Sequence, residues 1–139
     1  MKRVVLDTNV TIAALFWKGH PRTIYDSVHD KKFTMLLSPD MENEFIRVLG
    51  YPKFGLSPNE MQPFIKNLRR IAELLKTTTR ISVITSDPTD NIFLECALDG
   101  CADYVVSGDK HLLKLGVFSG IKIVNARELL IGEGFLAES

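Results

Sequence analysis

The stretch Val4-Val5-Leu6-Asp7-Thr8-Asn9 decides how the fold begins. Its apolar residues belong to a compact strand over residues 3–6, and an aspartate follows where that strand ends. A helical pattern over residues 8–18 starts directly afterwards, with apolar residues along one stripe. A strand that passes straight into a helix is typical of parallel α/β domains, whose sites lie outside the carboxyl ends of the strands.

The same alternation continues along the 139 residues. We expect strands over residues 3–6, 33–37, 81–84, 104–106 and 121–124. We expect helices over residues 8–18, 22–31, 39–49, 59–76, 87–100, 109–115 and 126–131. Such a pattern predicts one α/β domain over residues 1–139, with a parallel sheet and helices on both of its faces.

Composition limits the classes of protein that the chain can belong to. Apolar residues make up 45% and charged residues 24%, which suits a folded globular protein and excludes a disordered one. Lys plus Arg and Asp plus Glu each number 17, so the formal net charge is zero. That balance disfavours a protein that wraps nucleic acid through bulk positive charge.

The expected compartment is the cytoplasm, with no membrane association. The apolar runs are too short to span a bilayer, and Asp7 and Asn9 arrive before the core of a signal peptide could form. Cys96 and Cys101 lie five residues apart in and just after one predicted helical stretch, so their side chains should project from different faces. We therefore expect two buried, reduced thiols and no zinc site.

An acidic residue follows each of the first four predicted strands. Asp7 ends the first, Glu44 lies on the helix after the second, Asp90 follows the third and Asp109 follows the fourth. Carboxylates that converge at one edge of a sheet repel one another and need protons or cations. Mg²⁺ and Mn²⁺ prefer carboxylate and water oxygens, so this pattern predicts a site for a hard divalent cation.

Each acid taken alone also has an ordinary structural role. Asp7 and Asp109 suit the ends of helices, Asp90 can pair with Asp87 in a capping arrangement, and Glu44 can be solvated. Two features favour the joint site. Asp7 leaves a strand expected at the centre of the sheet, and Glu44 borders an apolar helical stripe.

The ordered set of motifs resembles a known family. Its pieces are Val5-Leu6-Asp7-Thr8-Asn9, Leu37-Ser38 with Glu44 and Val48-Leu49, Asp87-Pro88-Thr89-Asp90-Asn91, and residues 102–113, ADYVVSGDKHLL. In order and spacing the chain resembles PIN-domain ribonucleases over nearly its whole length. PIN is the fold of VapC-type toxins in toxin–antitoxin pairs, and the chain most resembles the subgroup assigned as toxin components.

The resemblance implies a three-layer α/β/α fold with a five-stranded parallel sheet in the order 3-2-1-4-5. It implies that the metal-binding, catalytic acids are Asp7, Glu44, Asp90 and Asp109. Asn9 matches a polar position that orients Asp7, and Ser107 matches a helper position beside the metal. Asp87 is expected to cap a helix, and the role of Asp103 is left open.

The implied activity is Mg²⁺- or Mn²⁺-dependent hydrolysis of phosphodiester bonds in single-stranded RNA by an endoribonuclease. The implied partners are a protein antitoxin and a second copy of the chain in a homodimer. Without the four predicted ligands, basic residues outnumber the remaining acids, which suits weak docking of an RNA backbone. Phe16 and Trp17 are assigned to the core or to a subunit contact, rather than to base stacking.

Three other functions are compatible with an α/β domain of this size. A phosphoacceptor receiver domain needs an acidic pair after its first strand, and here Asp7 is followed by Thr8 and Asn9. An aspartyl phosphatase needs a second Asp two residues on, where Asn9 cannot act as an acid or base. A non-catalytic PIN-like module that binds nucleic acid or protein remains the main alternative.

Overall fold

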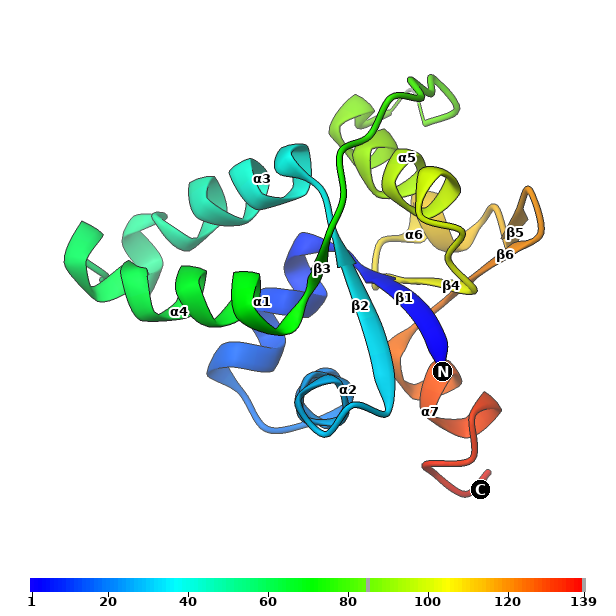
Figure 1. The fold of residues 1–139 in the computed structure, drawn as a ribbon, viewed down its shortest axis with the longest axis horizontal. Helices are drawn as coiled ribbons and strands as arrows, with labels where there is room; N and C mark the ends of the chain where they lie inside the picture. The colour runs from blue at the N-terminus through cyan, green and yellow to red at the C-terminus, as the bar shows by residue number, and fades with distance from the viewer. Residues whose placement is uncertain (85, 139) are drawn as a thin grey trace.

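The computed structural model describes residues 1–84 and 86–138. Figure 1 shows a central sheet with helices packed around it. The strands are β1 (Lys2–Leu6), β2 (Phe33–Leu37), β3 (Glu73–Leu74), β4 (Tyr104–Val106), β5 (Val117–Phe118) and β6 (Ile121–Val124). The helices are α1 (Thr8–Phe16), α2 (His20–His29), α3 (Pro39–Leu49), α4 (Pro58–Ile71), α5 (Asn91–Asp99), α6 (Lys110–Leu113) and α7 (Ala126–Gly132), with 3₁₀ turns at Pro52–Phe54 and Pro88–Asp90.

The predicted α/β/α fold is confirmed. Within the described residues the sheet has six strands in the order β3-β2-β1-β4-β6-β5, so its five parallel strands follow the expected 3-2-1-4-5 order. The additional strand, β5, is antiparallel to β6. Ser119 and Gly120 join these two strands with φ values of 49° and 80°, the backbone of a tight hairpin turn.

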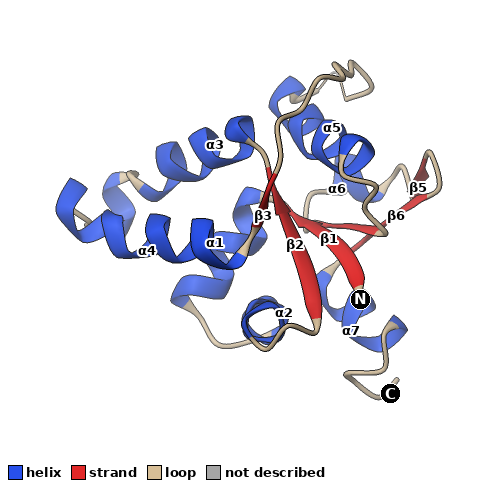
Figure 2. Cartoon of the chain, in the orientation of Figure 1, coloured by secondary structure: helices blue, strands red, loops and turns tan. Residues whose placement is uncertain are grey.

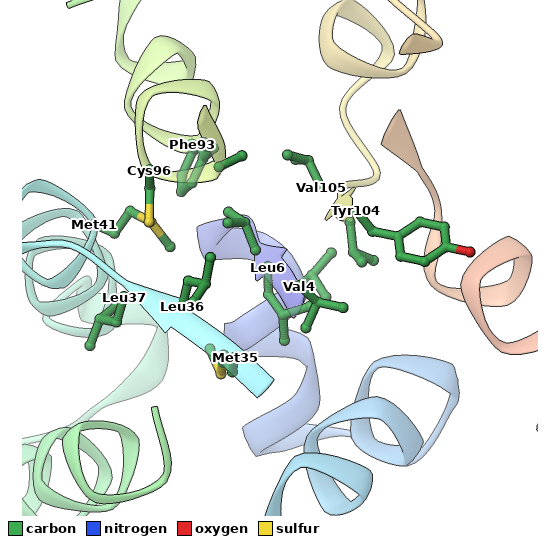
Figure 3. Close-up of a cluster of buried hydrophobic side chains, with 14 of the residues drawn as sticks. Val4, Leu6, Met35, Leu36, Leu37, Met41, Phe93, Cys96, Tyr104 and Val105 are labelled. Carbon is green, nitrogen blue, oxygen red and sulfur yellow. The ribbon is translucent and has the colours of Figure 1, made fainter. Parts of the chain in front are cut away.

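Helices lie on both faces of the sheet. Helix α5 packs against β1, β2 and β4, while α2 and α7 pack on the opposite side, against β2 and β4 respectively (Figures 1 and 2). Val4, Val5 and Leu6 of the central strand are fully buried between these layers. Figure 3 shows Leu36 of β2 and Val105 of β4 on the side of the sheet that carries Phe93 and Cys96 of α5, while the ring of Tyr104 points away from this helix. The side chains of both faces belong to one buried cluster.

The position of the third parallel strand was predicted wrongly. The sequence pattern placed it at residues 81–84, but the structure forms β3 at Glu73–Leu74, and α4 ends at Ile71 rather than at residue 76. Leu36 and Leu37 of β2 pair with this short strand. Arg3 of β1 reaches over to Glu73 with N–O distances of 2.6 and 3.2 Å, which fixes the register of the edge strand.

Residues 78–84 are held by side chains of α5 instead of by a sheet neighbour. Asn91, Glu95 and Asp99 accept hydrogen bonds from backbone amides of this segment at 2.7 to 3.1 Å. The three residues are four apart, so they form a row along one face of the helix. Because the amides are bonded to this row, the apolar segment packs on α5 without joining the sheet.

Two smaller expectations have different outcomes. Ser38 caps α3 as predicted, because its hydroxyl accepts a hydrogen bond from the amide of Met41 at 3.2 Å. Both cysteines are free, but only Cys96 is buried, so the prediction of two buried thiols is wrong for Cys101. Cys101 follows α5 in a turn with a φ of 52°, which takes its side chain to the surface. None of the described helices is long and apolar enough to cross a membrane.

Replacing Asn91 by alanine should destabilise the fold by about 2–3 kcal/mol, because the amides of Val83 and Ile84 and two carbonyls would lose their partner in a buried place. Urea denaturation followed by circular dichroism measures this change. Asn59→Ala, at an exposed position on α4, is the matched control. Equal stability of the two variants would show that the row on α5 does not hold residues 78–84.

Candidate metal centre

The structure brings the four predicted acids to one pocket. Asp7 leaves β1, Glu44 lies on α3, Asp90 precedes α5, and Asp109 follows β4. All four line a pocket of about 100 Å³ at the carboxyl edge of the sheet. Asn9, Asp87 and Thr89 line the same pocket. Segments from all along the chain therefore contribute to a single acidic site, as the parallel strand order requires.

Asp7 is the most buried of these acids, with 4% of its surface exposed. The amide of Val10 donates to its Oδ1 at 2.8 Å, and the hydroxyl of Ser107 donates to its Oδ2. Burial raises the pKa of Asp7 above its ordinary value, the two hydrogen bonds oppose that shift, and the charge of Asp109 adds to it. The carboxylate is thus fixed in place in surroundings that favour partial neutralisation.

Ser107 links two of the acids. Its buried hydroxyl donates to Asp7 and accepts a hydrogen bond from the amide of Asp109 at 2.9 Å. This contact holds the ends of β1 and β4 in a fixed relation. Asn9, which the resemblance assigned to orienting Asp7, is exposed and lines the same pocket. The hydrogen bonds to the Asp7 carboxylate come from the hydroxyl of Ser107 and the amide of Val10, with a further contribution from the backbone of Gly108.

Helix capping and the acidic site use the same residues. Asp7 is the N-cap of α1, and Asp109 is the N-cap of α6, where its Oδ1 accepts from the amide of His111 at 2.8 Å. Asp87 caps the turn before α5 by accepting from the amide of Thr89, as predicted. The structural roles considered for Asp7 and Asp109 are therefore real, and they help to aim the two carboxylates.

Asp90 carries the strongest sign of an incomplete site. Its Oδ2 is buried and has no hydrogen-bond partner among the described residues. Desolvation, followed by repulsion from Asp109, Asp87, Asp7 and Glu44, raises the pKa of Asp90 from 3.8 to about 7. A carboxylate in this position is stabilised by a proton or by a cation.

Glu44 differs from the other acids because its charge is already compensated. Arg47, one turn along α3, donates to both carboxylate oxygens of Glu44 at 2.6 and 3.1 Å. The same guanidinium donates to the hydroxyl of Tyr51 at 2.7 Å. Arg69 of α4 pairs instead with Glu42, and neither residue lines the pocket.

The donor set fits a hard divalent cation. Every charged side chain that lines the pocket is a carboxylate, and one carboxylate oxygen, Oδ2 of Asp90, lacks a partner among the described residues. Oxygen ligands of this kind are those that hard divalent cations prefer. In the described part of the chain, no three His, Cys, Asp or Glu side chains already form the ligand set of one ion. Asp7, Asp90, Asp109 and Glu44 could hold Mg²⁺ or Mn²⁺ with water completing the coordination, as Mg²⁺ commonly requires.

Comparison with known proteins defines the family. The family model of the PIN domain matches residues 3–111, and the chain belongs to this family. The fold is similar to a chain in the crystal structure of VapBC2 from Rickettsia felis bound to a DNA fragment from their promoter, with a TM-score of 0.56 and 15% identity over 88% of this chain and 98% of that one. A comparison with curated proteins finds no match.

A second solved structure is similar over almost the whole chain. PAE2754 from Pyrobaculum aerophilum has a TM-score of 0.60 and 15% identity, and the match covers 98% of this chain and 91% of that one. At this level of identity the two likenesses establish the fold. They agree with the family match and with the strand order of the sheet.

The desolvated carboxylate of Asp90, repelled by its acidic neighbours, makes the stability of the fold depend on pH. Between about pH 4 and 7 folded Asp90 keeps a proton that the unfolded residue has lost, so stability falls as the pH rises through this window. Asp90→Asn should therefore raise the melting temperature by about 3 °C at pH 8 in EDTA, with a smaller gain at pH 4.5. Differential scanning calorimetry measures both values.

The control for this measurement is Asp26→Asn, which alters an exposed aspartate on α2 outside the pocket. It should leave the melting temperature almost unchanged at both pH values. If Asp90→Asn gives no greater gain at pH 8 than at pH 4.5, the carboxylates of the pocket do not repel one another as inferred.

Proposed function

We propose that this protein is a metal-dependent endoribonuclease that hydrolyses phosphodiester bonds in single-stranded RNA. The observation that carries the proposal is the buried Oδ2 of Asp90, which has no partner among the described residues, in a pocket lined by all four predicted carboxylates and by Asp87. Membership of the PIN domain family supports a nuclease with this acidic site. Asp7, Glu44, Asp90 and Asp109 are the proposed catalytic residues.

The metal ligands in this proposal are the same four acids. Mg²⁺ or Mn²⁺, as one ion or two, would lower the pKa of a water molecule and shield the charge of the scissile phosphate. Asp7 and Asp109 are prepared for this role because Ser107 and the caps of α1 and α6 fix their orientation. Preorganised oxygens need little rearrangement when the ion binds.

Asp90 and Glu44 have different tasks from this rigid pair. Asp90 offers an oxygen that nothing else satisfies, so it contributes negative charge where the ion is needed. Glu44 faces the pocket from α3, and its two hydrogen bonds with Arg47 hold its carboxylate in one orientation. Glu44 could ligate a second ion or orient the attacking water. The guanidinium of Arg47 lies beside it and could donate a hydrogen bond to a phosphate oxygen.

The cellular role that we propose is that of the toxin in a toxin–antitoxin pair. The fold likeness to the Rickettsia felis VapBC2 structure, together with family membership, supports a protein antitoxin as partner. We also propose a homodimer, as the family resemblance implies. Two free cysteines are compatible with the reducing cytoplasm, which is the proposed location.

A non-catalytic PIN module is the second candidate. The pair between Glu44 and Arg47 favours it, because this arginine neutralises an acid that catalysis would use. The described side chains also lack a ready group of three ligands. Metal binding and cleavage, measured separately, distinguish this module from the enzyme.

Divalent cations should stabilise the folded protein. Adding 5 mM MnCl₂ or MgCl₂ to the EDTA-treated protein should raise its melting temperature, because a ligand that binds only the folded chain shifts the unfolding equilibrium. Asp7→Asn and Asp109→Asn should lose most of this shift, while Asp26→Asn keeps it. A shift of the same size in all four proteins would place the bound ion outside the pocket.

RNA cleavage should require both the metal and the acids. A mixed-sequence, labelled single-stranded RNA should be cut in Mn²⁺ or Mg²⁺ but not in EDTA, and a matched DNA should be cut far more slowly. Asp7→Asn should reduce the rate by about a hundredfold or more, since metal assistance contributes several kcal/mol to the transition state.

Asp26→Asn, purified in the same way, controls for contaminating ribonuclease and should cut like the wild type. Equal cutting by Asp7→Asn, or cutting that persists in EDTA, would contradict the enzymatic function. Metal binding without any cutting would support the non-catalytic module.

A further inference from the structure

A second hollow opens beside the acidic pocket. It is a groove of about 540 Å³ lined by Trp17, Arg47, Tyr51, Lys53 and Phe54. The groove and the pocket share four lining residues: Asn9, Glu44, Val48 and Asp87. The two hollows therefore adjoin, and the lining of the groove extends from the carboxylates to the ends of α1 and α3 and to the turn at Pro52–Phe54.

Trp17 is the one tryptophan in the sequence, and 59% of its surface is exposed. Its exposure excludes the core, which was one of the two places expected for it, and leaves the subunit contact as a prediction. Its ring meets Phe16 edge to face with centroids 6.0 Å apart, and Phe16 in turn stacks on Phe54 at 5.0 Å with the planes 9° apart. The indole is thus braced by a layer of aromatic rings while much of it stays open to solvent, where a large apolar surface is costly unless it binds something.

Two cations lie in the same groove. Arg47 directs three of its five N–H groups to Glu44 and Tyr51, so two remain, and 58% of its side chain is exposed. Its guanidinium also lies 5.4 Å from the ring centre of Tyr51, which holds its plane. The Nζ of Lys53 lies 5.2 Å from the ring centre of Phe54. Fixed cations beside flat rings match the chemistry of a nucleotide chain, which alternates phosphates and bases.

We propose that this groove binds the single-stranded RNA on one side of the cleaved bond. A base stacks on Trp17, and Arg47 and Lys53 contact backbone phosphates, while the acidic pocket receives the scissile phosphate. This inference rests on the proposed function and assigns the part of the substrate that the acids do not touch.

The groove suits a nucleic acid better than a protein segment. Its aliphatic members, Ile12 and Val48, are buried, so an amphipathic helix would find no row of exposed apolar side chains in it. Rings and cations form most of the accessible lining instead, with the exposed Asn9 and Asp87 on the side that borders the acidic pocket, where a phosphodiester would be cut. Stacking tolerates any base, so the groove contributes affinity with little sequence preference.

Because Trp17 is the only fluorophore of its kind, its emission reports on the groove directly. The Asp7→Asn protein in EDTA is titrated with a single-stranded RNA of about 12 nucleotides, a length that such sites bind. The tryptophan emission should be quenched, with a midpoint equal to that of the anisotropy of a labelled copy of the RNA. Trp17→Ala should weaken binding about tenfold, and Trp17→Phe should retain most of it.

The chain provides a matched control for the cation. Lys32 lies 5.8 Å from the ring centre of Phe135, much as Lys53 lies over Phe54, but it is outside the groove. Lys53→Ala should weaken RNA binding and reduce the dependence of log K on log salt by about 0.7, the value for one phosphate contact with a single strand. Lys32→Ala should bind RNA like its parent.

The outcomes separate this inference from the proposed function. If the wild-type protein cuts RNA, but RNA leaves the emission of Trp17 unchanged and Lys53→Ala behaves like Lys32→Ala, the groove is not the substrate site and the enzyme stands. If RNA quenches the emission of Trp17 but the wild-type protein cuts no RNA, the groove is supported as an RNA-binding site and the proposed nuclease activity is contradicted. If the emission of Trp17 changes with protein concentration and does not respond to RNA, a second copy of the chain covers the groove. That result would overturn the inference.

Discussion

The carboxylate of Asp7, buried at the end of the central strand, is the constraint around which the site is arranged. An isolated charge in this place would be costly, and the structure reduces that cost with a hydrogen bond from Ser107 and another from the amide of Val10. Since Ser107 also accepts from the amide of Asp109, the contact that stabilises one acid sets the position of a second. The order of the sheet, with β1 between β2 and β4, makes this contact possible.

The remaining charges are balanced in two ways. Glu44 has its own cation in Arg47, whereas Asp90 has a raised pKa and a buried oxygen without a partner among the described residues. The first arrangement leaves a fixed guanidinium at the mouth of the pocket, and the second leaves negative charge at its centre. Under the proposed function, a phosphodiester would pass the Arg47 guanidinium and would reach the carboxylates where a metal ion could shield their charge.

Sequence patterns predicted much of the site and less of the sheet edge. Asp7, Asp90 and Asp109 each follow a strand or the turn before a helix, so local patterns identified them. Residues 81–84 have the composition of a strand, and only the row of Asn91, Glu95 and Asp99 explains why they are not one. The spacing of that row was visible in the sequence, but its partners were not, because hydrogen bonds across the fold override local strand propensity.

The sequence by itself determined the alternation of strands and helices, and with it the placement of Asp7 and Asp109 at one edge of a parallel sheet. These features follow from local periodicity and from the geometry that every parallel sheet shares. Only the tertiary structure decided which donors fix Asp7, that Glu44 is paired, and that Trp17 is exposed at a groove joined to the acidic pocket. These outcomes depend on packing between segments distant along the chain, where burial and competition for hydrogen bonds choose among side chains that look equivalent in the sequence.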